Sequence, residues 1–546
     1  MASMGFTESN RAAMARLADS IYEPREAVEH DNDITSGANS IRPKQNLDLQ
    51  HTKSLEHSVS LPHEMVVIGI ISLAQFMTQV GLGQTLALLH IISDDFGITN
   101  PGIDAWLIAG YSLTVGTFIL VSGRMGDVFG YKRMLIIGYI WFAVWELVAG
   151  LAVYSTYVLF IWARVLSGIG LSICLPNALA LLGVLYQPGK RKNMAFALFG
   201  ALAPTGSIVG AAFGGIFALA WWPWAFWSTA LVLVAIAIIG KFAIPDPPRA
   251  IDSRAKTWLQ LFHLCDPLGS LTGVNALVLI NFAWNQAPIA GWSSPMCIVT
   301  LVIGLLLLPA FFYIELRVTP NPLVPFRELN SDAGFVLACI GLGWGSFGIW
   351  VYYLWSQLLV LRGISPLLAA AYLSPLIIMG TLAAFVSGLL LHSVGPAWTM
   401  TGAMTAFLIG IVLVATAPVD QIYWKNIFLT SIITCWGMDM SFPAATIILS
   451  NMTAREHQGV AASLVNTIVN YSISLCLGFA GTVEVHVNNG GGTPEDVLKG
   501  YRGALYLGIG LAAMGLVVSL VFVGKLTLKD RRAANSGNAE KARTES

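Results

Sequence analysis

The stretch GRMGDVFGYKR, Gly123 to Arg133, places four charged residues and three glycines between two long apolar runs. A helix needs about 20 mostly apolar residues to cross the ~30 Å hydrocarbon core of a bilayer, and each flanking run approaches that length. Glycine permits tight turns and the close approach of two chain segments. The stretch therefore predicts a short polar turn that joins two membrane helices.

Apolar runs of this length occur fourteen times along the chain. Of the 546 residues, 55% are hydrophobic and only 11% are charged, so little chain remains for a separate soluble catalytic domain. We therefore predict an all-α polytopic membrane protein that is not an enzyme. The expected spans are residues 66–91, 105–123, 134–153, 157–184, 195–219, 224–244, 270–290, 296–315, 334–355, 366–391, 397–417, 424–449, 460–482 and 502–525.

Polar segments flank the apolar runs. Residues 1–62 are polar, mixed in charge and poor in aromatics, which predicts a disordered tail without a signal peptide. Residues 527–546 form a second polar tail. If the first tail is cytoplasmic, thirteen Lys and Arg residues lie at inside loops and helix ends and four lie outside. Both termini are therefore expected in the cytoplasm, and the plasma membrane is the expected location.

The chain also contains an internal repeat. The segments GLSICLPNA and GMDMSFPAA share the spacing of a glycine, a proline and an alanine, at 170, 176 and 178 and at 437, 443 and 445. The turn from Gly123 to Gly130 has a counterpart with the same glycine spacing, Gly388 to Gly395. These matches align spans 1–6 with spans 9–14 and leave spans 7 and 8 as an inserted pair. The alternative is coincidental similarity among fourteen helices.

Two parallel six-helix halves around a central cavity are the construction of many secondary transporters. The expected division is a half at 63–245, a linker with two additional helices at 246–330, and a second half at 331–526.

The turn GRMGDVFGYKRM resembles the signature between the second and third helices of the major facilitator superfamily. In that family the signature forms a charge-relay latch between the two halves. The resemblance implies a conformational gate, whereas the simpler alternative is a basic anchor that obeys the positive-inside rule. The implied gate residues are Gly123, Gly126, Asp127, Gly130, Lys132 and Arg133.

Two further motifs narrow the resemblance. RVLSGIG, which contains Arg164, resembles the R-x-x-x-G-x-G motif of the fourth helix, and GALAPTGSIVGAAFGG resembles the antiporter motif of the fifth. The simplest physical role of the glycines in the second motif is to let a neighbouring helix pack closely. The resemblance covers residues 66–525 and is to the fourteen-helix drug:proton antiporter family, within it to a fungal group related to aminotriazole-resistance and boron-export transporters. The antiporter-motif residues are Pro204, Gly206, Gly210, Gly214 and Gly215.

The first helix departs from the family pattern, since Gly83 stands where members commonly carry an aspartate. Proton coupling must then use another group, and ionisable residues inside membrane spans are the natural candidates. Asp439 is the first choice, in a stretch from Gly437 to Pro443 where a helix break is expected. Arg164 is its expected electrostatic partner across the cavity. Glu146 is a second candidate, or else a structural partner of a nearby helix.

Substrate contacts are expected from amide and aromatic side chains in the spans. Packing is the competing explanation for the aromatics, and it is as plausible as binding for the amides. The candidates are Gln79, Gln84, Asn177, Trp344, Gln357, Asn466, Asn470 and Tyr471.

The sequence thus predicts a proton-coupled exporter of small toxic compounds, drugs or secondary metabolites. Its expected partners are the lipid bilayer, a small-molecule substrate and protons, and a monomer is expected. Neither a cofactor, a metal site nor a nucleic-acid partner is indicated by any motif, and the six cysteines fit small buried hydrophobes. Two alternatives stay open: an uptake or facilitative carrier for a small inorganic or nitrogenous solute, and a membrane sensor that does not transport.

Overall fold

The computed structural model describes residues 60–98, 100–186, 190–246, 257, 260, 264–327, 329–452 and 458–544. Within these residues the regular structure is helical, and fourteen helical spans are long and apolar enough to cross a membrane. The predicted number of spans and the all-α class are confirmed. The expected disordered tail lies outside the described residues, apart from its last three positions.

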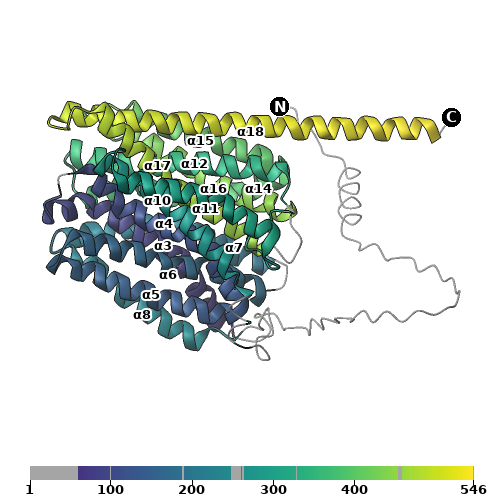
Figure 1. Ribbon diagram of the computed structural model, residues 1–546, viewed down its shortest axis with the longest axis horizontal. Helices are drawn as coiled ribbons and strands as arrows, with labels where there is room; N and C mark the ends of the chain where they lie inside the picture. Colours follow the sequence, from purple (N-terminus) through teal and green to yellow (C-terminus); the bar gives the residue numbers. More distant parts are fainter. Residues whose placement is uncertain are drawn as a thin grey trace, which may run out of the picture. The chain divides into compact units, whose positions relative to one another are not determined.

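The first half of the chain supplies six spans (Figure 1). They are α3 (Leu61–Asp95), α4 (Pro101–Phe129), α5 (Tyr131–Leu151) with the short η1 (Ala152–Tyr154), α6 (Tyr157–Leu185), α7 (Lys190–Ala218) and α8 (Pro223–Ala243). Two further helices follow, α10 (Pro267–Ala290) and α11 (Pro295–Tyr313), the latter continued by the π-helical turn η2 (Ile314–Val318).

The last six spans complete the bundle. They are α12 (Ser331–Ser356) with η3 (Gln357–Leu361), α13 and α14 (Pro366–Leu373 and Pro375–Ser393) as one span, α15 (Pro396–Ala415), α16 (Asn426–Met452), α17 (Gln458–Val487) and α18 (Pro494–Thr544). Helix α18 continues into the predicted polar tail, which is rich in the good helix formers Ala, Lys, Arg and Glu.

The turn between α4 and α5 is a single residue. Gly130 has φ +99°, a backbone conformation that costs most L-residues energy and costs glycine little. Gly395, which occupies the matching turn between α14 and α15, has φ +84°. The glycine repeat in the sequence therefore marks two equivalent reversals of the chain.

Helix packing repeats in the same way. The pairs α3–α7, α5–α6, α4–α6 and α5–α8 of the first half recur as α12–α17, α15–α16, α14–α16 and α15–α18 in the second. The two halves meet where α4 packs on α17 and where α7 packs on α14. This is the fold of two six-helix halves with two inserted helices, and it supports the division at 63–245, 246–330 and 331–526 that we propose.

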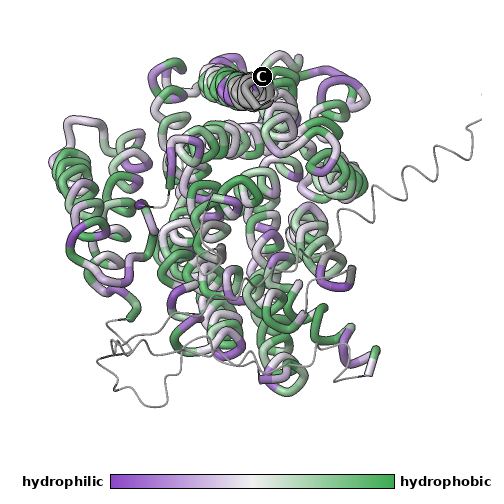
Figure 2. Tube along the Cα trace, turned by 90° about the vertical axis from the view of Figure 1, so that its right-hand side faces the viewer, coloured by the Kyte–Doolittle hydropathy of each residue, from purple (hydrophilic) through white to green (hydrophobic). Residues whose placement is uncertain are grey.

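The inserted helices pack beside the α4–α17 contact between the halves. Helix α10 packs on α4 and α17, whereas α11 packs mainly on α10. Only 11% of the most apolar stretch of the α11 span is buried, although its mean hydropathy of 2.6 is the highest among the spans. Hydrophobic residues, drawn in green, recur along all parts of the helical trace (Figure 2), as expected for helices that cross a bilayer.

The closest packing in the first half joins α3 to α7. A Cβ atom at Gly206 or Gly210 would overlap with the backbone carbonyl oxygen of Phe76 or Val80, and one at Gly214 would press on that of Gln84. The glycines of the antiporter motif thus form the face of α7 on which the backbone of α3 lies. Small residues at such positions allow membrane helices to approach closely.

We expect Gly210→Val to destabilise the protein by about 1–3 kcal/mol or more, because overpacking a tight contact forces the helices apart. The matched control is Gly200→Val on the same helix, where a Cβ has no neighbour within 4 Å. Thermal unfolding in detergent measures the difference. Equal melting temperatures for the two variants would contradict this account of the α3–α7 contact.

Candidate functional site

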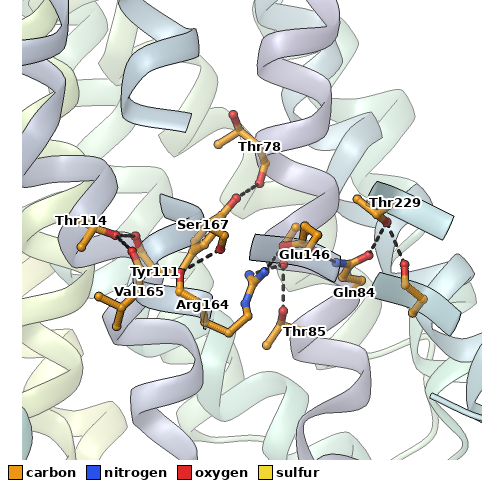
Figure 3. A network of polar contacts seen from close by, with 12 residues as sticks. Thr78, Gln84, Thr85, Tyr111, Thr114, Glu146, Arg164, Val165, Ser167 and Thr229 are labelled. Carbon is orange, nitrogen blue, oxygen red and sulfur yellow. Dashed lines mark hydrogen bonds and ion pairs between the residues drawn. The ribbon is translucent and has the colours of Figure 1, made fainter. Parts of the chain in front are cut away.

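A buried ion pair lies in the middle of the first half (Figure 3). Arg164 on α6 and Glu146 on α5 are both 0% exposed, and Arg164 Nη1 lies 2.5 Å from Glu146 Oε1. Arg164 Nη2 donates to the carbonyl oxygen of Gly81 at 2.7 Å. The guanidinium carbon lies 4.4 Å from the centre of the Tyr111 ring, within the range of a cation–π contact.

The second carboxylate oxygen of Glu146 is also bonded. Gln84 Nε2 donates to Glu146 Oε2 at 2.8 Å, and Gln84 Oε1 accepts from Thr229 Oγ1 at 3.0 Å. The network therefore joins α3, α4, α5, α6 and α8. A buried charge pair is tolerated only when further hydrogen bonds satisfy both partners, and here both oxygens of the acid have donors.

Arg164 is therefore paired within its own half, and the expected pairing with Asp439 is wrong. Helices α5 and α6 pack side by side, which brings Glu146 to Arg164, whereas Asp439 lies on α16 in the other half. Of the two predicted roles of Glu146, its contacts support that of a structural partner of a neighbouring helix.

The position of the missing first-helix acid has no room for a side chain. A Cβ at Gly83 would overlap with the carbonyl oxygen of Ser207 on α7. The next residue, Gln84, supplies a neutral amide that both donates and accepts in the network. The polarity of the first helix is thus carried by an amide instead of an ionisable group.

Asp439 lies at the seam between the halves. A Cβ at Gly380 of α14 would lie 3.2 Å from Asp439 Oδ2 and 2.7 Å from Pro204 Cγ of α7. Asp439 Oδ2 is buried and has no hydrogen-bond donor among the described residues. Asp439, placed where α7, α14 and α16 meet, thus differs from Glu146 in having no counter-ion in the part of the chain that the structure describes.

The helix around Asp439 is continuous, so the expected break is wrong. Helix α16 runs through Pro443, although proline lacks the N–H that would bond to the carbonyl of the residue four positions earlier, which is Asp439. Gly437 serves packing instead, because a Cβ there would press on the Phe407 ring of α15. Contacts with neighbouring helices hold α16 in its helical form.

The residues of the predicted gate lie at the α4–α5 turn, which is called the gate turn below. Tyr131 Oη donates to Asp127 Oδ1 at 2.9 Å, and Arg124 Nη1 lies 3.9 Å from Asp127 Oδ2. Lys132 Nζ forms an ion pair with Asp246 Oδ1 at 3.0 Å, beyond the end of α8, while Arg133 is exposed. The side chain of Asn177 on α6 fills the space beside Gly126.

The substrate candidates fall in several places. Gln84 and Asn177 belong to the network and to the gate, and Gln79 lies beside Gly206 between α3 and α7. Trp344 Nε1 donates to Ser441 Oγ at 3.1 Å, while the amides of Asn466 and Asn470 bond to carbonyls of their own helix. Gln357 is buried in η3, and Tyr471 Oη donates to the Leu277 carbonyl of α10 at 3.1 Å. Tyr471 also lines a cavity of about 240 Å³ beneath the inserted helices.

Sequence reasoning did not single out Tyr111 or Thr229 as members of the network. Each lies beside a serine in a mostly apolar run, so the run itself gives no signal that marks it out. Their roles depend on which helices pack together, and residue spacing within one span does not reveal that.

Two equivalent six-helix halves with two inserted helices are the construction of many secondary transporters, and here one half holds a buried charge network while the seam holds an acid oxygen without a donor among the described residues. The sequence profile of the Major Facilitator Superfamily matches residues 71–478. The chain belongs to the Major Facilitator Superfamily, whose members are transporters and not enzymes.

Several curated fungal proteins are similar along most of their length. The low affinity ammonium transporter of Saccharomyces cerevisiae is 49% identical over 87% of this chain and 92% of its own length. The efflux pump terG of Aspergillus terreus is 44% identical over 86% of this chain and 87% of its own length. The aminotriazole resistance protein of S. cerevisiae is 39% identical over 86% of each chain. These relatives agree with the fungal group that the motifs indicated.

A solved structure of the peptide transporter POT in complex with sulfate has a similar fold. It aligns with a TM-score of 0.59 at 14% identity, and the alignment covers 84% of this chain and 94% of the other. At this identity the likeness concerns the fold alone.

The Arg164–Glu146 pair leads to a prediction about stability. Glu146→Gln leaves Arg164 buried without a counter-ion and should cost about 3–5 kcal/mol, as removal of one partner of a buried pair usually does. The double variant Glu146→Gln/Arg164→Gln removes both charges and should recover part of the loss. Thermal unfolding in detergent measures the stability of both variants. If Glu146→Gln alone is as stable as the double variant, the two charges do not stabilise the fold as a pair.

Proposed function

We propose that the protein is a proton-coupled exporter of small toxic compounds, drugs or secondary metabolites, and that Asp439 is the proton-binding group. The observation that carries the proposal is the unpartnered carboxyl oxygen of Asp439 at the seam formed by α7, α14 and α16. A charged carboxylate costs about 2.5–3.5 kcal/mol at the centre of a membrane span on insertion scales, so the closed seam favours the neutral acid. When the seam opens to water, the acid can release its proton.

Pro204 supports the same assignment. It belongs to the antiporter motif and lies on the α14 side of α7, beside Gly380 and the Asp439 carboxyl group. A relative movement of the two halves along α7 and α14 would therefore change the solvent exposure of Asp439. Proton binding and conformational change are linked whenever one conformation holds the proton more tightly.

The names of the relatives favour export without deciding it. Efflux pumps and a resistance protein are 39–44% identical to the chain, which supports export of toxic compounds. The relative named for ammonium transport is 49% identical, and this observation supports the second candidate, an uptake or facilitative carrier for a small nitrogenous solute.

Overexpression in a yeast host across a panel of toxic compounds and ammonium analogues tests the direction of transport. We expect resistance to at least one compound with the parent protein and with Glu495→Gln, an exposed acid at the start of α18 that serves as the matched control. Asp439→Asn should lose that resistance while it reaches the membrane in equal amount. Sensitisation by the parent protein would favour uptake.

Inside-out vesicles separate coupling from export for a compound found in this way. With an imposed pH gradient the parent should accumulate the compound, whereas Asp439→Asn should only exchange it downhill, because its amide cannot bind and release a proton. If Asp439→Asn still responds fully to the gradient, the proton site lies elsewhere.

A further inference from the structure

The inserted helices carry two buried acids at one end. Asp266 is the N-cap residue of α10, and Glu315 lies in η2, which continues α11. Their side chains are buried, with residue exposures of 3% and 4%. Neither residue belongs to the gate, to the Arg164 network or to the seam around Asp439.

Each acid uses one oxygen in an ordinary hydrogen bond. Asp266 Oδ1 accepts from the backbone N–H of Gly269 at 3.1 Å, and Glu315 Oε2 accepts from that of Val324 at 3.2 Å. The other two oxygens, Asp266 Oδ2 and Glu315 Oε1, are buried without a donor among the described residues. Both point to the same place beside Gly269, where a Cβ atom would overlap with both of them.

Two acceptor oxygens that face each other form a hydrogen bond only if one of them carries a proton. Two ionised carboxylates at such a site would repel each other with little solvent to screen them, so one proton shared between them is the favourable state. Its release passes the proton to water and leaves two like charges side by side.

Among the residues that the structure describes, the positive charges nearby are directed elsewhere. On α4, Arg124 Nε donates to the Leu264 carbonyl at 3.0 Å and the same side chain faces Asp127. Arg317 and Arg327 are exposed, and Arg327 bonds to the Leu316 carbonyl. Other charged groups on the packed elements lie away from the pair. They are Asp104 in the first turn of α4, Glu484 and His486 at the far end of α17, and Asp332 of α12, which is paired with Lys525.

The acid pair connects three parts of the protein. The residues just before α10 contact the gate turn, through Leu264 with Arg124 and through an apolar cluster of Cys265 and Val128. The bond from Val324 ties Glu315 to the segment that leads into α12 of the second half. The site therefore lies where the inserted helices meet the gate turn and the start of the second half.

We propose that Asp266 and Glu315 bind one proton between them, and that this carboxyl pair fastens the ends of the inserted helices to the gate turn. Loss of the proton drives the two side chains apart and loosens the segment before α10. This proton site goes beyond the proposed export function and does not depend on the direction of transport.

The adjacent cysteine provides the test. Cys265 is buried, and burial raises the pKa of its thiol. In a chain whose five other cysteines are replaced by alanine, the rate of maleimide labelling reports the opening of this segment. The thiolate itself becomes more abundant as pH rises, so the parent must be compared with Glu315→Gln and Asp266→Asn, whose amides donate the hydrogen bond without a titrating proton.

Between about pH 6 and about pH 9, labelling of the parent should rise about tenfold more than labelling of either amide variant, which is a shift of about 1.4 kcal/mol in opening. Glu484→Gln, at a buried acid on α17, should keep the pH profile of the parent. Glu315→Gln and Asp266→Asn are independent checks. If one of them fails to fold, the labelling of the other is still measured. The same pH profile in the parent and in a folded amide variant would overturn the proposal.

Discussion

The buried pair of Arg164 and Glu146 is the interaction on which the first half depends. Two charges inside a membrane bundle persist if they neutralise each other and gain further hydrogen bonds. Here Gln84 and the Gly81 carbonyl supply such bonds and the Tyr111 ring lies against the guanidinium, while Arg164 Nε has no partner among the described residues. Because those groups come from different helices, the arrangement of the whole half is fixed by one electrostatic requirement. The glycine face of α7 adds the close approach of α3. The first half is therefore expected to move as a rigid body.

A rigid half needs a flexible boundary if it is to transport. That boundary is the contact of α7 with α14 and of α4 with α17, and Asp439 lies on it with no counter-ion among the described residues. The two kinds of acid have different roles for a physical reason. Glu146 is held by Arg164 and Gln84, which fixes it to neighbouring helices, whereas Asp439 Oδ2 has no donor among the described residues.

The sequence predicted the spans well because a bilayer demands a length of apolar chain that few other structures need. It also predicted the paired turns, since Gly130 and Gly395 carry positive φ angles that favour glycine. It failed where partners come from other helices: Arg164 was assigned to Asp439, and Asp266 was not considered beside Glu315. The expected break at Pro443 was wrong because neighbouring helices stabilise a helix that proline alone would weaken.

We propose that the first half moves as one rigid body and that the proton on Asp439 sets its position against the second half. Spin labels at Met65→Cys and Met194→Cys report α3 against α7, while labels at Met194→Cys and Leu389→Cys report α7 against α14, all at exposed positions. Pulsed dipolar spectroscopy on a chain that lacks the native cysteines, at acid and alkaline pH, measures both distances. We expect the α7–α14 distribution to shift with pH and to stay fixed in Asp439→Asn, while the α3–α7 distribution is constant throughout. An α3–α7 distance that shifts as much as the α7–α14 distance would contradict the account.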